Sequence, residues 1–408
     1  VDPERQNRQN IDDSIDRHFQ DTMRGGHNKN NPELVKKLVE EAPATMHWLE
    51  GKGLGFGPKV RVIVGGLYPR GHGAEGGGYG YIRVLEKFIK AYPDKVKVFT
   101  DTQAVKLIKN EAGKVIGVLG KHDSKDVNFM ASKGVIIATG GFGSNVEMRQ
   151  AKNTGVWKEV TLDKNIPCTN NFKASQGDGL KLAEQVGTNV INLDDIQLHP
   201  GGTPKTGIMS SWPSGRNRIF LTPQGDRFVN EDAARDTLCK AVFKEGGKYW
   251  IVSNHVKYPT LDYQSKNLTI GEMIKLGQAF SGNTIEELAQ KTGMDPKKLR
   301  ASIDTYNDVV TGKIKEDNLG FKKFTQDDKP MTEGPFYATP MVPAVHHTMG
   351  GIQINSAAQV LDKAGHVIPG LFAAGEATGG VHGSNRVGGN GVADAMVFGR
   401  ISGQSALK

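Results

Sequence analysis

The stretch from Ala374 to Gly391 constrains the fold of this chain more than any other feature of its sequence. An apolar run, "VIPGLFAA", leads into it, and the small-residue segment "NGVADAM" ends it. This order predicts a strand, a glycine-rich loop and a helix. Glu376 stands at the strand exit, where a carboxylate can accept hydrogen bonds from ribose or ribityl hydroxyls, and the first-turn N–H groups of the helix would form an anion site. The alternative is that the glycines only allow close packing of helix and strand.

A second glycine-rich strand exit predicts the same kind of domain. Val135–Ala138 is an apolar strand that runs, one residue later, into a Gly-Gly pair. Mixed β and α segments with such exits are typical of an α/β nucleotide-binding domain. Residues 194–345 have polar loops and two well-marked helices, and we interpret them as an inserted domain. The first domain would then comprise residues 1–193 and be completed by residues 346–408.

Local signals predict several elements. Residues 32–50 have the capping residue, first-turn proline and apolar spacing of a helix. A second helix is expected over residues 81–92. The run "KVKVFTD", residues 95–101, predicts a strand. Thr284 and Glu287 have the spacing of a capping box.

The sequence "GHGAEG", Gly71–Gly76, fits the dinucleotide-binding pattern G-x-G-x-x-G by its letters. That fingerprint needs its first glycine at the tight turn directly after a strand. Here a segment that includes Pro69 separates the first glycine from the apolar run before it. We interpret Gly71–Gly76 as a flexible loop over a pocket, in preference to a pyrophosphate-binding turn.

Composition argues against several classes of function. The formal net charge is +8, but the lysines are scattered and no aromatic-basic stripe is present, so we expect no nucleic-acid binding. A mildly basic surface would instead attract anionic substrates. Cys168 and Cys239 provide neither a disulfide framework nor a metal site, and the pair His346-His347 has no further ligands at suitable spacing, so no metal is expected. No apolar run is long enough to span a bilayer.

Four motifs in combination resemble one family: "IIATGGF", "DRFVNEDAARD", "VHHTMGGIQI" and "PGLFAAGEATGGVHGSNRVGGNG". They are similar to the flavin subunit of soluble flavocytochrome c fumarate reductases. Relatives of these include urocanate, methacrylate and cinnamate reductases and, more distantly, 3-ketosteroid dehydrogenases. The resemblance covers essentially the whole chain and implies an FAD-binding Rossmann-like α/β domain with an inserted α+β capping (clamp) domain. The family's N-terminal strand–GxGxxG–helix–strand unit has no match here, so we expect an FAD site that is incomplete without that segment.

The resemblance also implies roles for single residues. Arg235 matches the family's proton-donating arginine, although an arginine has a pKa above ~12 and would have to be refilled through a relay. The alternative is a surface arginine paired with Asp232 or Asp236. His346 and Arg386 match the residues that hold the substrate carboxylate, for which the planar guanidinium is well shaped. The implied substrate-binding residues are His199, Ser210, Ser211, His346 and Arg386.

The implied reaction is hydride transfer from reduced flavin N5 to the β-carbon of an unsaturated carboxylate, with Arg235 protonating the α-carbon. The inserted domain would close over the flavin domain and exclude water. His347 matches a histidine lying against the flavin. The implied cofactor-binding residues are Val105, Thr139, Gly140, Gly141, Gly177, Asp178, His347, Gly375, Glu376, Gly389 and Val392.

The substrate is expected to differ from fumarate. The family's Thr-Glu clamp for a second carboxylate falls on Ser210 and Ser211, and its relay arginine falls on Ser214, with Trp212 between them and Arg216 a candidate replacement in the relay. Two short hydroxyls are a poorer clamp, so we expect an unsaturated monocarboxylate such as acrylate, methacrylate, cinnamate or urocanate. The alternatives are fumarate reduction itself, a ketosteroid-type flavin dehydrogenase, and a non-catalytic flavin- or anion-binding subunit.

The electron donor is expected to be external: a cytochrome c or an FMN-carrying domain or protein. The resemblance further suggests the bacterial periplasm and anaerobic respiration, with the cytoplasm as the alternative location.

Overall fold

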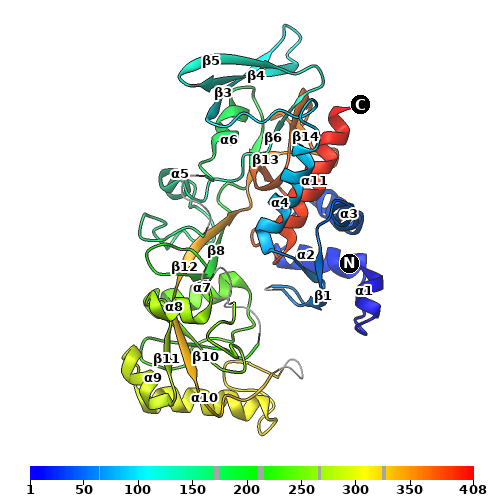
Figure 1. Cartoon of the computed structure of the whole chain (residues 1–408). Coiled ribbons are helices and arrows are strands. Elements are labelled where there is room, and N and C mark those ends of the chain that lie inside the picture. The colour runs from blue at the N-terminus through cyan, green and yellow to red at the C-terminus, as the bar shows by residue number, and fades with distance from the viewer. Residues whose placement is uncertain (64, 170–173, 210–215, 265–267, 324–327) are drawn as a thin grey trace. The chain divides into compact units, whose positions relative to one another are not determined.

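The computed structural model describes residues 1–63, 65–169, 174–209, 216–264, 268–323 and 328–408. The chain divides into two compact units, each described here by itself (Figure 1). The fold is mixed α/β, as expected from the sequence. Unit 1 comprises Val1–Val160, Lys173–Ile196 and His347–Lys408, and unit 2 comprises Thr161–Phe172 and Gln197–His346.

The strands and helices of unit 1 come from its three chain segments. The strands are β1 (Phe56–Arg61), β2 (Gly71–Ala74), β3 (Thr102–Lys109), β4 (Val115–His122), β5 (Lys125–Met130), β6 (Val135–Ile137), β7 (Val190–Ile191), β13 (Gly351–Gln353), β14 (Gln359–Leu361), β15 (Val367–Ala373) and β16 (Thr378–Gly379). The helices are α1 (Pro3–Asn7), α2 (Ile15–Gly25), α3 (Pro32–Gly51), α4 (Gly77–Lys90), α5 (Val146–Ala151), α6 (Asp178–Glu184), the 3₁₀ turn η1 (Gly375–Ala377) and α11 (Asn390–Ala406).

Parallel pairs join distant parts of the sequence in unit 1. β15 pairs in parallel with β6, and β13 pairs in parallel with β16. The C-terminal segment therefore completes the same sheet that the early strand β6 belongs to, and α11 packs against α3 and β15 (Figure 1). β3, β4 and β5 form a separate antiparallel sheet. Both glycine-rich strand exits predicted from the sequence thus belong to one unit.

Unit 2 is an antiparallel sheet covered by helices. Its strands are β8 (Ile196–Gly202), β9 (Ile219–Leu221), β10 (Tyr249–Asn254), β11 (Phe280–Gly282) and β12 (Phe336–Thr348), and its helices are α7 (Arg235–Lys244), α8 (Ile270–Lys275), α9 (Ile285–Thr292) and α10 (Pro296–Val310). The sheet order is β11-β12-β10-β9, with β8 also paired to β12. Leu288, Leu299 and Ile303 pack with Ile219 and Val252 in one buried apolar cluster.

The segment Thr161–Phe172 belongs to unit 2, an association that the sequence did not indicate. Cys168 and Val345 form an isolated parallel β-bridge, and the Thr169 amide donates to the Val345 carbonyl at 2.8 Å. These bonds attach the segment to β12. The other unit boundaries lie within three residues of positions 194 and 346.

Two predicted helices form, with boundaries that differ slightly from expectation. α3 begins and ends as predicted within one residue, and Asn31 Oδ1 accepts from the Glu33 amide at 3.0 Å. α4 begins at Gly77, four residues earlier than expected. The predicted strand at residues 95–101 is wrong: Val96 and Val98 are 40% and 67% exposed. Alternating residues form a strand only where one face is covered, and this segment has no such cover.

The remaining local predictions are partly right. Thr284 Oγ1 accepts from the Glu287 amide at 3.1 Å, but Glu287 Oε2 accepts from the Asn283 amide at 2.8 Å. The capping box therefore forms in only one direction. Gly71–Ala74 is not a loop but the strand β2, paired antiparallel with β1. Among the described residues, no helix is long and apolar enough to cross a membrane.

Candidate functional site

The loop before α11 places a glycine at the start of that helix. β15 leads into η1 and β16, and the chain then enters α11 through Gly389, whose φ is +80°. In this part of the structure, no side chain accepts a hydrogen bond from the first turn of α11. The N-terminus of a helix carries partial positive charge and N–H donors. The Asn390 and Val392 amides already donate to the Val387 and Gly389 carbonyls, so the anion site expected from the glycine pattern stays a prediction.

Arg386 places a cation beside this helix start. Its side chain is buried, and Nη1 donates to the Val387 carbonyl at 3.2 Å. A Cβ added at Gly391 would lie 3.1–3.3 Å from Nε, Cδ and Cζ of Arg386, so the guanidinium lies against the first turn of α11. Burial lowers the pKa of Arg386 to about 10, with Glu376 and Asp394 acting in the opposite direction. Arg386 therefore stays charged at neutral pH.

The carboxylate of Glu376 contacts the last two residues of β12. Its Oε1 accepts from the Thr348 amide at 3.0 Å, and its Oε2 lies 3.4 Å from His347 Nδ1. Burial raises the pKa of Glu376, but His347 and the Thr348 amide lower it, and the net shift is downward. A Cβ at Gly141 would lie 2.1 Å from Thr348 Oγ1 and 2.6 Å from Glu376 Oε1, so this position accepts only glycine.

His382 and Asp394 belong to the same buried group, and the sequence reasoning missed both. His382 Nε2 lies 3.1 Å from Asp394 Oδ2, and the His382 ring meets the His347 ring edge to face with centroids 5.3 Å apart. Burial lowers the pKa of His347, against the effect of Glu376. The available signal was a histidine inside the motif "GGVHGSNR", twelve residues before an aspartate on the helix that follows.

The other predicted cofactor residues also lie in unit 1. Gly140 and Gly177 have positive φ, +75° and +77°, and the Gly177 amide donates to the Gly141 carbonyl at 3.1 Å. A Cβ at Gly179 would lie 2.1 Å from Thr139 Oγ1, which sets α6 directly against the β6 exit. The remaining positions are Val105 on β3, Asp178 at the start of α6, Gly375 in η1 and Val392 in the first turn of α11.

Unit 2 carries a second group of predicted residues. Arg235 is the first residue of α7, is buried, and donates from Nη1 to Gln197 Oε1 at 2.9 Å. The His199 and His346 rings have centroids 4.8 Å apart. His199 Nδ1 accepts from the Gly201 amide at 3.0 Å, so a neutral His199 carries its proton on Nε2. Thr169 Oγ1 lies 2.6 Å from His346 Nδ1.

Some predicted residues cannot be placed with either group. Ser210 and Ser211 lie outside the described residues, as do Trp212 and Ser214. The boundary between the units falls between His346 and His347, within β12. The structure thus assigns His346 to the group with Arg235 and His347 to the group with Arg386.

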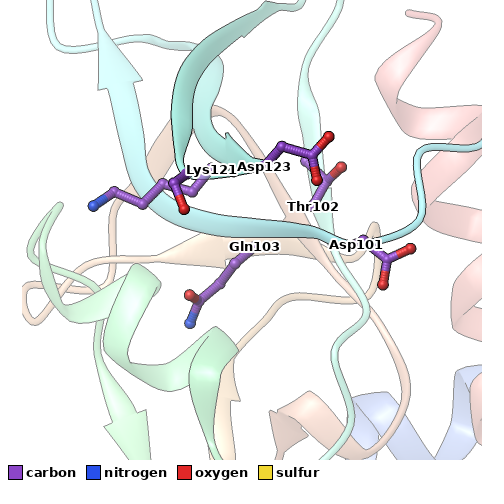
Figure 2. Close-up of a pocket in the computed structure, with 6 residues that line it drawn as sticks. Asp101, Thr102, Gln103, Lys121 and Asp123 are labelled. Carbon is purple, nitrogen blue, oxygen red and sulfur yellow. The ribbon is translucent and has the colours of Figure 1, made fainter.

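A polar surface hollow of about 590 Å³ lies elsewhere in unit 1. Figure 2 shows its residues at one end of the β3–β4 pair, where Gln103 and Lys121 are partners in register. Asp101 and Asp123 also line it. None of the predicted site residues lines this hollow, and it takes no part in the site described above.

Comparison with known proteins decides the family. Residues 3–392 match the family described as FAD binding domain. The chain belongs to this family. This chain is 36% identical over 383 residues to the NADH:acrylate oxidoreductase of Vibrio harveyi, and the match covers 92% of this chain and 37% of that protein. The urocanate reductase of Eggerthella lenta is 33% identical, with 98% of this chain and 66% of that protein covered.

A solved structure supports the same assignment. The open conformation of a flavocytochrome c3 fumarate reductase superposes with a TM-score of 0.74 at 31% identity, covering 99% of this chain and 69% of that chain. The predicted resemblance is confirmed. This chain spans 37% of the length of the acrylate oxidoreductase and about two thirds of the other two proteins.

The residues of this FAD-binding chain fit the cofactor. His347 Nε2 is a buried ring nitrogen without a hydrogen-bond partner among the described residues. Gly141 lies where any side chain would collide with Glu376 and Thr348, and the positive end of the α11 dipole favours an anion at Gly389. FAD is therefore the cofactor of this fold, and Glu376, His347 and the α11 N-terminus are the groups that would hold it.

Proposed function

We propose that this chain, with FAD bound, reduces the C=C bond of an α,β-unsaturated carboxylate. The observation that carries the proposal is Arg386, a buried guanidinium at the start of α11 whose burial lowers its pKa to about 10. A planar guanidinium at such a place is suited to bind both oxygens of a carboxylate. Similarity to reductases named for acrylate, urocanate and fumarate favours a conjugated carboxylate as its ligand.

The roles of the residues follow from their chemistry. FAD, when bound, supplies the hydride. Arg386 would grip both carboxylate oxygens through its planar fork, which also withdraws charge from the conjugated alkene and makes its β-carbon electrophilic. His346 would donate a second hydrogen bond to the carboxylate. Arg235 would give a guanidinium proton to the carbanion-like α-carbon and would be reprotonated from solvent through a relay. Its pKa above ~12 ensures that the proton is present before the step.

We further propose that the preferred substrate is a monocarboxylate. Arg216, five residues after Ser211 in sequence, donates from Nη2 to Asp328 Oδ2 at 2.8 Å and from Nη1 to Asp232 Oδ2 at 2.9 Å. Arg218 Nη2 lies 3.2 Å from Asp232 Oδ1. A second substrate carboxylate at this place would compete with two aspartates for the same guanidinium groups, which favours an uncharged distal group.

A substrate panel tests the proposed function. The FAD-loaded chain would be assayed with reduced viologen and acrylate, methacrylate, cinnamate, urocanate and fumarate, because specificity is expressed in the ratio of kcat/KM values. We expect one or more monocarboxylates to give the highest kcat/KM. If fumarate were reduced with a higher kcat/KM than every monocarboxylate, the substrate assignment would be wrong. If none of the five were reduced by a flavin-loaded chain, the proposed activity would be wrong.

The electron donor and location remain part of the proposal. The solved relative is a flavocytochrome, which favours a haem-carrying donor over an FMN-carrying one. Soluble haem donors of this kind suit a bacterial periplasm and anaerobic respiration. Reduction of the bound flavin by a purified cytochrome c, followed by its absorbance, tests this part separately from the viologen assay.

A further inference from the structure

Val387 follows Arg386 in the chain and contacts its guanidinium through the main chain. Arg386 Nη1 donates to the Val387 carbonyl at 3.2 Å, and the Val387 side chain is 6% exposed. The same carbonyl accepts from the amide of Asn390, the first residue of α11, at 3.3 Å. The direction of the guanidinium therefore depends on where the backbone of Val387 is held. Direction matters because a guanidinium binds both oxygens of a carboxylate only when its plane is aligned with them.

The Val387 side chain packs against glycines from two other parts of unit 1. A Cβ added at Gly25, the last residue of α2, would lie 2.3 Å from Val387 Cγ2. A Cβ added at Gly66 would lie 3.7 Å from Val387 Cγ1. Carbon atoms that are not bonded to each other pack at about 3.5–4.0 Å, so no side chain fits at Gly25 unless Val387 moves.

The backbone at Gly25 does not itself require glycine. Its φ is not positive, and the residue belongs to a helix, where alanine is intrinsically more favourable than glycine. The contact with Val387 is therefore what excludes a side chain at this position. Val387 is β-branched and has a stiff χ1, so a Cβ at Gly25 would push the backbone that Arg386 contacts.

The turn after α2 holds the chain on the other side of Arg386. The Ser384 amide donates to the Gly26 carbonyl at 3.0 Å. Asn30, which is 6% exposed, donates from Nδ2 to the Val381 carbonyl at 2.8 Å. Buried main-chain groups of a loop need partners, and this turn supplies two of them. Arg386 thus lies between two points at which α2 and its turn hold the chain.

We propose that the end of α2 and the turn after it, residues 25–30, position Arg386 for the carboxylate that it binds. This inference rests on the proposed function, because it takes the substrate carboxylate as the ligand of Arg386. A displacement of Val387 tilts the guanidinium and breaks one of its two parallel hydrogen bonds to the carboxylate. Carboxylate affinity then falls, while the fold and the flavin content are kept.

A pair of substitutions tests the contact between Gly25 and Val387. The FAD-loaded full chain would be titrated by calorimetry with propanoate, a saturated carboxylate that cannot be reduced. Gly25→Ala should raise the Kd about tenfold, the loss expected for one charge-assisted hydrogen bond. Val387→Ala removes the methyl group in the way and leaves the Cβ of position 387 at 3.7 Å from the new Cβ. In the double variant, Val387→Ala should therefore restore most of the affinity that Gly25→Ala loses, whereas two independent defects would add.

A second variant tests the turn without adding bulk. Asn30→Ala removes the hydrogen bond to the Val381 carbonyl and should raise the propanoate Kd by about threefold to tenfold. Asn153→Ala is the matched control, because Asn153 Nδ2 also donates to main-chain carbonyls of unit 1, those of Trp157 and Val160, at 2.9 and 2.8 Å. This control should lower the melting temperature at least as much as Asn30→Ala does and leave the Kd at the wild-type value.

Gly403→Ala is the control for Gly25→Ala, since an added Cβ at Gly403 of α11 would meet nothing within 4 Å. Its Kd should equal that of the wild type. An unchanged Kd in both Gly25→Ala and Asn30→Ala, or a double variant no better than Gly25→Ala alone, would overturn the inference. Asn30→Ala decides the outcome by itself if Gly25→Ala does not fold. The proposed function stands in these cases as long as Arg386→Ala weakens propanoate binding. Full affinity in Arg386→Ala, or no binding by the wild type, would overturn both.

Discussion

Two buried arginines, one in each unit, show how differently a protein can surround the same side chain. Arg386 lies among the ionised or ionisable groups Glu376, Asp394 and His347, and burial lowers its pKa to about 10. Arg235 Nη1 donates to the neutral amide oxygen Oε1 of Gln197 at 2.9 Å. Charged neighbours fix the position and net charge of a site that holds an anion. The Gln197 amide oxygen fixes the position of one guanidinium nitrogen of Arg235, which suits a group that has to deliver a proton to a defined atom.

The largest effect should follow removal of Arg235. Replacing it with Gln should lower kcat by at least about 100-fold, the usual range for losing a general acid, while propanoate affinity and flavin content change little. Arg300→Gln, which removes an exposed arginine of the same unit paired with Glu286, should keep full activity. The measurement is kcat and KM with the best substrate of the panel. Retention of more than about a tenth of wild-type kcat would rule out Arg235 as the acid.

Removal of Arg386 should act on binding as well as turnover. Arg386→Lys should fail nearly as badly as Arg386→Ala, because an ammonium lacks the two-pronged geometry and leaves Glu376 and Asp394 with a poorer partner. We expect a loss of at least about 30-fold in kcat/KM, equivalent to about 2 kcal/mol for a broken buried charge contact. Arg400→Lys on the same helix, where the guanidinium donates to Thr45 at 2.8 Å, is the control. A fully active Arg386→Lys would mean that Arg386 attracts anions only through its charge.

The sequence predicted the strands and helices around the site in unit 1 better than the contacts among its buried charged side chains. Strand-loop-helix order and glycine spacing are local properties, so β15, α11 and the Gly141 exit could be placed from residue types alone. The contact of Glu376 with His347 and Thr348 joins residues almost thirty positions apart, and the His382–Asp394 pair depends on how a loop folds back on a helix. Neither contact leaves a periodic pattern, and the position of a polar side chain in a loop is set by tertiary packing.

Unit 2 shows a related limit. The sequence identified Arg235, His199 and His346 through resemblance, and the structure adds that His346 lies beside Thr169 in a segment assigned from sequence to the other domain. The strand wrongly predicted at residues 95–101 also shows that tertiary contacts decide what a segment forms. Its residue types favour a strand, but a strand also needs a neighbour and a covered face, and neither can be read from the segment itself.

The smallest effect concerns the stability of unit 1 in acid. His18 bonds Asn390 at the start of α11, and its pKa falls from 6.5 to about 4 because it is buried. The unfolded chain therefore binds more protons than the folded one between these two values. Stability from the neutral ring is complete above pH 6.5 and is lost as the pH falls toward 4.

Each pH unit in this window corresponds to about 1.4 kcal/mol, so at pH 5.5 we expect the wild type to have lost about 1 kcal/mol relative to a His18→Gln variant. His47→Gln removes an exposed histidine of α3 and should behave as the wild type does. Denaturant unfolding at pH 7.5 and 5.5 measures the free energies, and amide exchange shows where the loss occurs. The first turn of α11 should exchange faster in acid in the wild type but not in His18→Gln, while α10 of unit 2 should respond equally in both. Equal acid sensitivity of α11 in the two proteins would mean that His18 does not stabilise the N-terminal end of that helix. The difference between the Arg386 and Arg235 sites would then depend only on the direct contacts of each arginine.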